Sequence, residues 1–462
     1  MFDRKKAVLY ALPIFFLAIM IGPAGSIIQG IYTREFGISL SAIATAITVC
    51  RILDAITDPV VGMLSDRTRN WPGGRKFWVV AGSAILLLGA YFLFNPSRDH
   101  LSAGYFFVAY FITLLGWTVV EVSHLSWGAE LSSNYDDRSR IFSYRTGFLF
   151  AGTLLFLVLP LIIELHKTGN IHSLLLAEYT SETLRIAFML IAFLFPLTIF
   201  LTTRFCPQGA QVVAATHISL RDLLKALRAN QPLRVFAGMV MLFFVGNGMQ
   251  AALAYLHLAS YLQLGKQAPF IYALCLPLNL LMIPVWLKWM RKYEKNTMLI
   301  AGISLSAVFF ILLGFIRPGP NAFIEYLVVF AALQLLQPAW QILPPSILGD
   351  VSDYATLKTS VDQTATFYSI YAFLYKAISG LGSALGFALA SAFGFNPANN
   401  VHSDSAAFGI CLAMAFVPAL LAFAAAWCAF RLPLTRARHG VIRRRLDRRA
   451  ARLVRQAGAA VS

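Results

Sequence analysis

Six ionisable side chains lie well inside the longest apolar stretches of this sequence. Three are acids and three are bases: Asp54, Asp58, Glu121, Arg51, Arg145 and Lys376. If those stretches cross a membrane, each charge near the bilayer centre costs at least about 2.5–3.5 kcal/mol on insertion scales. Charged residues are rare at such depths and usually mark a path for ions or substrate. They are therefore the first candidates for a functional site.

The spacing of the first group predicts a cation site. Arg51, Asp54 and Asp58 follow one another at i, i+3 and i+7, which places them on one face of a helix, with Thr57 beside them. Carboxylates and a hydroxyl are hard oxygen ligands that suit a small monovalent cation such as Na⁺. The same carboxylates could instead carry a proton if desolvation raises their pKa. The residues alone leave the choice between Na⁺ and H⁺ open, and no other metal site is expected.

A second polar face lies in a later apolar stretch. Thr118 and Glu121 stand at i and i+3, and His124 continues that face. If the two faces meet, Thr118 and Glu121 join the cation site, and His124 together with Arg145 and Lys376 could suit an anionic sugar as substrate. The alternative is purely structural, because the acids could simply neutralise the nearby bases and hold helices together. Two acids one turn apart repel each other, however, and this repulsion favours an ion or proton between them.

The remaining candidates are predicted to contact the substrate. Arg145 and Lys376 could hydrogen-bond substrate hydroxyls or an anion, or could only balance the charge of Glu121 or Asp54. Lys376 comes from the other half of the chain, so it could sense whether the halves have closed. Trp340 and Gln341 could line the cavity, because sugar sites commonly combine an aromatic platform with amides.

The composition indicates that the apolar stretches do cross a membrane. The chain is 58% hydrophobic and 13% charged, whereas soluble domains are about 45–50% apolar and about 25% charged. A soluble fold would lack the polar residues needed to cover its surface. A soluble enzyme, a nucleic-acid-binding domain and a disordered chain are therefore excluded. We see no metal cluster, nucleophile motif or phosphate loop in the sequence, so we expect neither catalysis nor a cofactor.

A membrane-spanning helix needs about 20 mostly apolar residues. The sequence predicts twelve such helices, near 6–32, 39–64, 77–95, 103–130, 140–163, 183–203, 234–262, 268–289, 297–316, 321–347, 365–395 and 406–430. Most of the 38 Lys and Arg residues then fall on one side, which predicts cytoplasmic termini in a bacterial-type inner membrane. We therefore expect an all-α membrane protein with twelve transmembrane helices.

The polar segments divide the chain into four parts. We predict a six-helix half over 1–203, a cytoplasmic central loop over 204–233, a second six-helix half over 234–430 and an Arg-rich cytoplasmic tail over 431–462. Two six-helix halves are a known plan for transporters with a site between the repeats. The tail is expected to lie against anionic lipid and not on nucleic acid, because it lacks interleaved aromatics. No obligate protein partner is evident.

Three ordered motifs carry a resemblance to a known family. They are RILDAITDPVVGMLSDRTRNWPGGRKFWVV (51–80), LSWGAELSSNYDDRSRIFSYR (125–145) and GDVSDYATLKTSVDQTATFYSIYAFLYKAISGLGSALG (349–386). Together they resemble the glycoside–pentoside–hexuronide:cation symporters, a group of the major facilitator superfamily that includes melibiose and glucuronide permeases. The DAxxDPxxGxxSDRTR core is quite specific to that group.

The resemblance implies a fold, a function and particular roles. It implies the major facilitator fold, cation binding at Asp54 and Asp58 with Thr57 and Thr118 as neighbours, and substrate contact at Glu121 and Arg145. It also implies coupling or gating roles for Lys376, Arg51, Asp66 and Arg67. The function expected is cation-coupled symport of a sugar or glycoside by alternating access. The alternative is a carrier of a lysolipid, another amphiphile or an organic anion on the same fold.

Overall fold

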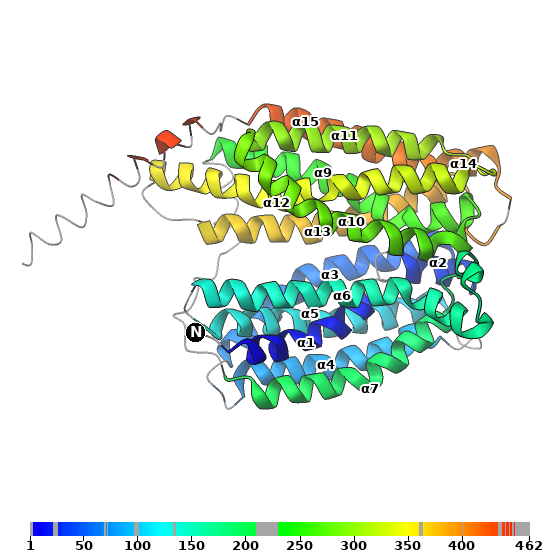
Figure 1. The fold of residues 1–462 in the computed structure, drawn as a ribbon, viewed down its shortest axis with the longest axis horizontal. Helices are drawn as coiled ribbons and strands as arrows, with labels where there is room; N and C mark the ends of the chain where they lie inside the picture. Colours follow the sequence, from blue (N-terminus) through cyan, green and yellow to red (C-terminus); the bar gives the residue numbers. More distant parts are fainter. Residues whose placement is uncertain are drawn as a thin grey trace, which may run out of the picture.

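The fold consists of two helical bundles that lie side by side (Figure 1). The computed structural model describes residues 3–21, 26–68, 71, 73–96, 101–132, 135–208, 230–359, 364–399, 401–432 and parts of 437–448. Within these residues every regular element is a helix. The end of the bundles that carries the N-terminus is called the N-terminal end here, and the opposite end is called the far end.

The first bundle contains the helices of the N-terminal half. These are α1 (Arg4–Ile21), α2 (Ile27–Arg34), α3 (Leu40–Arg67), α4 (Gly74–Phe94), α5 (Ala103–Glu130), α6 (Tyr135–Thr168), the short η3 (Ile171–Leu176) and α7 (Ser181–Phe205). Glycines allow α4 and α5 to pack closely, since a Cβ at Gly116 would lie 2.5 Å from the Cα of Leu86. The Ser102 side chain caps the start of α5 by accepting a hydrogen bond from the Tyr105 amide.

The second bundle contains the helices of the C-terminal half. These are α9 (Gln231–Leu256), η4 (His257–Tyr261), η5 (Gly265–Gln267), α10 (Ala268–Lys292), α11 (Lys295–Phe315), α12 (Ala322–Thr359), α13 (Thr364–Ala392), α14 (Asp404–Cys411), η6 (Leu412–Phe416) and α15 (Val417–Phe430). The Asn230 side chain caps α9 through the Leu233 amide. The two bundles meet where α13 packs on α3 and α10 packs on α6.

The observed helices follow the predicted spans, but fewer of them meet the length and hydropathy expected of a membrane-spanning helix. Ten helices of the described residues are long and apolar enough to cross a membrane, whereas the sequence predicts twelve. The other two predicted stretches are occupied by the α1–α2 pair and by α13. The first of these consists of two separate helices, of 18 and 8 residues. Residues 209–229 of the predicted central loop and most of the predicted tail lie outside the described residues.

Cys206 lies just after α7 and is a buried free thiol. Its Sγ donates a hydrogen bond to the Lys6 carbonyl over 3.5 Å, and burial raises the pKa of this thiol to about 11. Because the thiolate is the reactive form, we expect a water-soluble maleimide to leave Cys206 unlabelled near pH 7 in the folded protein. Mass spectrometry should detect labelling once detergent unfolds the chain, and rapid labelling of the folded protein would contradict this prediction.

Candidate functional site

An ion pair between the two halves marks the centre of the site. Lys376 on α13 donates to the Asp58 carboxylate on α3 over 2.5 Å, and its ammonium lies 3.5 Å from the Thr118 hydroxyl on α5. Thr118 in turn donates to the other Asp58 oxygen over 3.0 Å. The Lys376 ammonium also lies 4.9 Å from the ring centre of Trp117, a cation–π distance. One base of the second half thus binds an acid and a hydroxyl of the first.

Asp54 lies one turn from Asp58 on α3 and has a base of its own. Arg51 donates to the Asp54 carboxylate over 3.3 Å, and the Asp54 side chain is only 5% exposed. Lys376 and Asp58 also act on Asp54 electrostatically. The stem of Arg51 packs on Gly380 of α13, where an added Cβ would lie 2.5 Å from the arginine Nε. A glycine at this position therefore allows α3 and α13 to approach.

The third ion pair lies within the first half. Arg145 of α6 donates to the Glu121 carboxylate of α5, and both side chains are mostly buried. The arginine Nε has no hydrogen-bond partner among the described residues. Both partners were predicted to contact substrate. The protein encloses this Nε, so an incoming hydroxyl group would reach it only if the surrounding side chains move.

The pairing corrects one step of the sequence argument. The repulsion between Asp54 and Asp58 does not require an ion between them, because each acid has a base within hydrogen-bond distance. The Thr57 hydroxyl lies 3.5 Å from the Asp54 backbone carbonyl, to which it can donate. A cation at Asp58 would have to displace Lys376. Such competition is a chemical route by which ion binding could alter the contact between the halves.

Of three other residues predicted to contact substrate, two are buried in packed side chains and one lines a cavity. His124 is fully buried and stacks on Tyr10 with ring centres 4.1 Å apart, so its predicted substrate contact is not supported. Trp340 is also buried, and its ring centre lies 5.3 Å from that of Phe243 in the core of the second half. Gln341 does line a cavity, described below.

The predicted gating pair at the end of α3 lies apart from the ion pairs. Arg67 is exposed in the last turn of α3, at the N-terminal end, and the side chain of Asp66 lies outside the described residues. The described part of the chain contains no cluster of three His, Cys, Asp or Glu residues that could hold a metal ion.

A cavity of about 550 Å³ opens between the two halves beside α6. Its walls come from α6, α10 and α12: Thr146, Gly147, Leu149, Phe150, Ala151, Thr153, Leu154, Leu276, Pro277, Asn279, Leu280, Ile283, Gln337 and Gln341. Sequence reasoning missed Asn279. The available signal was an amide two residues after a proline inside an otherwise apolar span.

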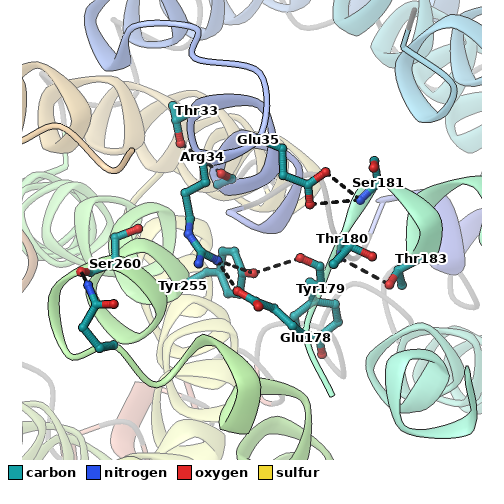
Figure 2. Close-up of polar contacts among 12 residues, drawn as sticks. Thr33, Arg34, Glu35, Glu178, Tyr179, Thr180, Ser181, Thr183, Tyr255 and Ser260 are labelled. Carbon is teal, nitrogen blue, oxygen red and sulfur yellow. Dashed lines mark hydrogen bonds and ion pairs between the residues drawn. The ribbon is translucent and has the colours of Figure 1, made fainter. Parts of the chain in front are cut away.

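The far end of the interface is closed by a polar cluster that the sequence did not reveal (Figure 2). Arg34 at the end of α2 donates to Glu178 over 2.6 Å and reaches the Tyr255 hydroxyl at 3.4 Å. Tyr255 belongs to α9 of the second half, and its hydroxyl donates to the Tyr179 carbonyl over 3.2 Å. A Cβ at Gly30 would lie 2.6 Å from the Tyr255 ring. The halves are thus joined tightly at this end.

At the N-terminal end, each of two described ion pairs joins residues of the same half. Arg75 donates to Glu130 over 2.9 Å in the first half, and Lys295 donates to Asp350 over 2.9 Å in the second. The cluster at the far end therefore differs from these pairs because it links the halves. It is the contact expected to break when the interface opens at that end.

Replacing Glu178 with glutamine should weaken closure of the far end. The Arg34–Glu178 pair lies within the first half, is about three-quarters buried and holds Arg34 within reach of the Tyr255 hydroxyl of the second half. Its loss should therefore weaken the contact with Tyr255 and shift the balance by on the order of 1 kcal/mol, about fivefold. Spin labels at the exposed residues Ser39 and Lys266, one on each half, would report longer distances by pulsed electron resonance. Glu182→Gln is the matched control, because the Glu182–Lys167 pair is about half exposed and, unlike the Glu178–Arg34 pair, has no described contact with Tyr255. Identical distance distributions in both variants would contradict this role.

Comparison with known proteins decides the family. Residues 9–436 match the family described as MFS/sugar transport protein. The chain belongs to this family. It is therefore a multi-pass membrane transporter with the major facilitator fold and not an enzyme. Its relatives fit the glycoside–pentoside–hexuronide:cation symporter group, which confirms the resemblance that the motifs predicted.

This MFS/sugar transport protein is similar in sequence to several curated transporters and similar in fold to a solved structure. An uncharacterized symporter of Synechocystis is 23% identical, covering 90% of this chain and 92% of its own. The isoprimeverose transporter of Lactiplantibacillus pentosus is 24% identical, covering 84% and 80%. A sodium-dependent lysophosphatidylcholine symporter of Danio rerio is 27% identical, covering 72% and 68%. A mutant of the nucleoside transporter NupG superposes with a TM-score of 0.69 at 12% identity, covering 92% and 99%, and supports the fold alone.

Proposed function

We propose that this transporter carries a sugar or glycoside together with a cation, Na⁺ or H⁺, by alternating access. One observation carries the proposal: a lysine of the second half binds the acid and hydroxyl on the first half that were predicted to hold the cation. A cation that takes the Asp58 oxygens competes with Lys376. Ion binding then acts directly on the contact between the halves, which is what coupling requires.

The substrate is proposed to bind next to this contact. Arg145 offers the donor that has no partner among the described residues, and Glu121 offers a carboxylate oxygen. Sugar hydroxyls can both donate and accept, so they can bind between these two groups. Lys376, once displaced from Asp58, becomes a further donor. Cation and substrate would thereby stabilise the same arrangement, and each should tighten the binding of the other.

The orientation is part of the proposal. The basic loops support a cytoplasmic N-terminal end in an inner membrane. Closure at the far end, through Arg34, Glu178 and Tyr255, then supports a conformation that is shut toward the outside. Transport inward would require this cluster to open, admit ion and substrate, and close again.

Binding of a panel of sugars to the purified protein tests the proposal. The panel should include xylose, glucose, galactose, glucuronic acid and their methyl glycosides, each titrated with and without Na⁺ and at two pH values. We expect at least one sugar to bind more tightly in the presence of Na⁺ or at lower pH. Proteoliposomes should accumulate that sugar against its gradient when a cation gradient is imposed. Binding of no sugar under any cation condition would refute the proposal.

The second candidate function is transport of a lysolipid. It is favoured by the apolar walls of the cavity between α6 and α10 and by the lysophosphatidylcholine symporter among the relatives. Competition discriminates between the candidates, because a lysolipid carrier would bind lysophosphatidylcholine in a cation-dependent way and ignore the sugars.

A further inference from the structure

The cavity between α6, α10 and α12 has walls that favour a hydrocarbon chain. Its volume is about 550 Å³, and most of its lining side chains are apolar, among them Leu149 and Phe150 of α6 and Leu276 of α10. Two of its amides, Asn279 and Gln337, hydrogen-bond each other. Even an apolar cavity of about 150 Å³ stays dry and takes up apolar ligands. A larger apolar cavity of this kind therefore suits hydrocarbon better than water.

The membrane lies next to this cavity. All three helices that form its walls contain stretches long and apolar enough to span a bilayer. Leu280 lines the cavity and is 40% exposed, and the next residue, Leu281, is 69% exposed and lies outside the cavity wall. Lipid tails cover exposed leucines of a membrane span, because the tails are as apolar as the leucine side chain. The bilayer can therefore supply a chain to the cavity directly.

Basic side chains lie at the N-terminal end of the same two helices, α6 and α10. Arg140 is the first residue of the membrane-spanning part of α6, and the membrane-spanning part of α10 ends at Met290. Lys288 lies just before this end and Lys292 just after it, and both are exposed. In the described part of the chain, neither Arg140 nor Lys288 has a carboxylate partner. These bases suit the phosphate of an anionic lipid headgroup.

The distance from these bases to the cavity matches the length of one acyl chain. Along α6, Arg140 lies about 15 Å from Phe150 of the cavity wall, at about 1.5 Å per residue. Along α10, Lys288 lies about 12 Å from Leu280 by the same measure. One leaflet contributes about 15 Å, half of a hydrocarbon core of about 30 Å. A headgroup on the bases thus places the distal part of its chain in the cavity.

We propose that the cavity binds one acyl chain of an anionic phospholipid whose headgroup lies on Arg140, Lys288 and Lys292, in the leaflet at the N-terminal end. The lipid is a resident ligand of the transporter and not its cargo, so the inference goes beyond the proposed function and does not depend on the substrate. A zwitterionic lipid meets the same apolar walls but brings no net charge for the three bases to complement.

Photo-crosslinking of the full-length protein in nanodiscs tests the inference. The nanodiscs consist of phosphatidylcholine with the same small fraction of one of two probes, phosphatidylglycerol or phosphatidylcholine, each with a diazirine near the end of one acyl chain. We expect the phosphatidylglycerol probe to label the cavity wall, within 146–154 and 276–283, at least about fivefold more, since one basic residue near the membrane surface contributes about that factor. Phe193 of α7 is 86% exposed and lies outside the cavity, so both probes should label it equally.

Filling the cavity should remove the chain. A Cβ at Gly147 meets no atom within 4 Å, so Gly147→Leu adds a side chain to the cavity without straining the fold. Labelling of the α10 wall should then be lost, while labelling of Phe193 persists. Gly238→Leu is the matched control, because a Cβ at Gly238 of α9 also meets no atom within 4 Å and lies outside the cavity wall. This control should keep the labelling of the wild type.

Removing the bases of α10 should remove the preference between headgroups. Lys288→Gln combined with Lys292→Gln should make the two probes label the cavity wall about equally. Arg204→Gln is the control, because it removes an exposed base in the last turn of α7, away from the cavity wall. The control should keep the preference for phosphatidylglycerol.

Three results would overturn the resident lipid. The first is equal labelling of the cavity wall by both probes in the wild type, and the second is labelling of the α10 wall that survives Gly147→Leu. The third is labelling that lysophosphatidylcholine displaces only when Na⁺ is present, because the cavity would then belong to a transport path. Sugar binding and uptake are measured separately, so none of these results decides the symport proposal.

Discussion

Replacing Asp58 with asparagine is expected to abolish the coupling between cation and substrate. Coupling of this kind is typically worth about 1–3 kcal/mol, or about 5- to 150-fold in affinity. In the Asp58→Asn variant, the cation should no longer change the affinity for the sugar identified in the panel. Accumulation in proteoliposomes should fall to simple equilibration. The reason is that the amide cannot supply the charge for which the cation and Lys376 compete.

A double variant separates coupling from mere charge balance. Asp58→Asn alone leaves Lys376 without its acid, which can destabilise the protein. Asp58→Asn combined with Lys376→Ala removes both charges of the pair and should recover thermal stability without recovering coupling. Recovery of cation-driven accumulation by the double variant would show that the pair is only structural. Asp350→Asn is a matched control, because Asp350 pairs with Lys295 inside the second half and should leave coupling intact.

Gly380→Ala is expected to hold the two halves apart where α3 and α13 meet. An added Cβ would overlap the stem of Arg51, at 2.5 Å from its Nε. Overpacking typically costs about 1–3 kcal/mol. If the overlap is relieved when α3 and α13 separate, the population of the present conformation should fall by about 5- to 150-fold relative to a conformation open at the far end. Spin labels at Ser39 and Lys266 should report the longer distance, and uptake should fall.

The control for this substitution is another helical glycine. A Cβ at Gly238 of α9 meets no atom within 4 Å, so Gly238→Ala should leave both the distances and the uptake unchanged. If Gly380→Ala gave the wild-type distance distribution with full uptake, the approach of α3 and α13 would not depend on this glycine. The pair of alanine variants thus tests the interface without altering any charge.

The fold could be predicted well because hydrophobic length is a local property. The predicted stretch 103–130 coincides with α5, and most other helices begin and end within a few residues of their predicted limits. The prediction was weaker where a helix is interrupted. The run over 6–32 did contain a local signal for this break, because Gly22, Pro23 and Gly25 lie between α1 and α2, but a prediction based on hydrophobic length alone does not use it.

The site could be predicted only in part because side-chain pairing depends on which helices meet. The sequence named Lys376 as one of several bases that could pair with Asp54 or Asp58, but it could not single out the contact with Asp58, because the two residues lie more than 300 positions apart. Helical spacing placed His124 on the face of Glu121, yet His124 packs on Tyr10 of α1. Asn279 escaped notice because a single amide among apolar residues gains meaning only from the cavity it lines.

The three ion pairs of the candidate site, one of which joins the two halves, have a consequence for the energetics of transport under a membrane voltage. Together they contain three negative and three positive side chains, so the unloaded site carries no net charge. Adding one monovalent cation and a neutral glycoside makes the loaded site positive by one unit. A potential that is negative inside would then drive only the loaded form inward, with about 2.3 kcal/mol per 100 mV for a full crossing. The empty carrier would return without electrical work.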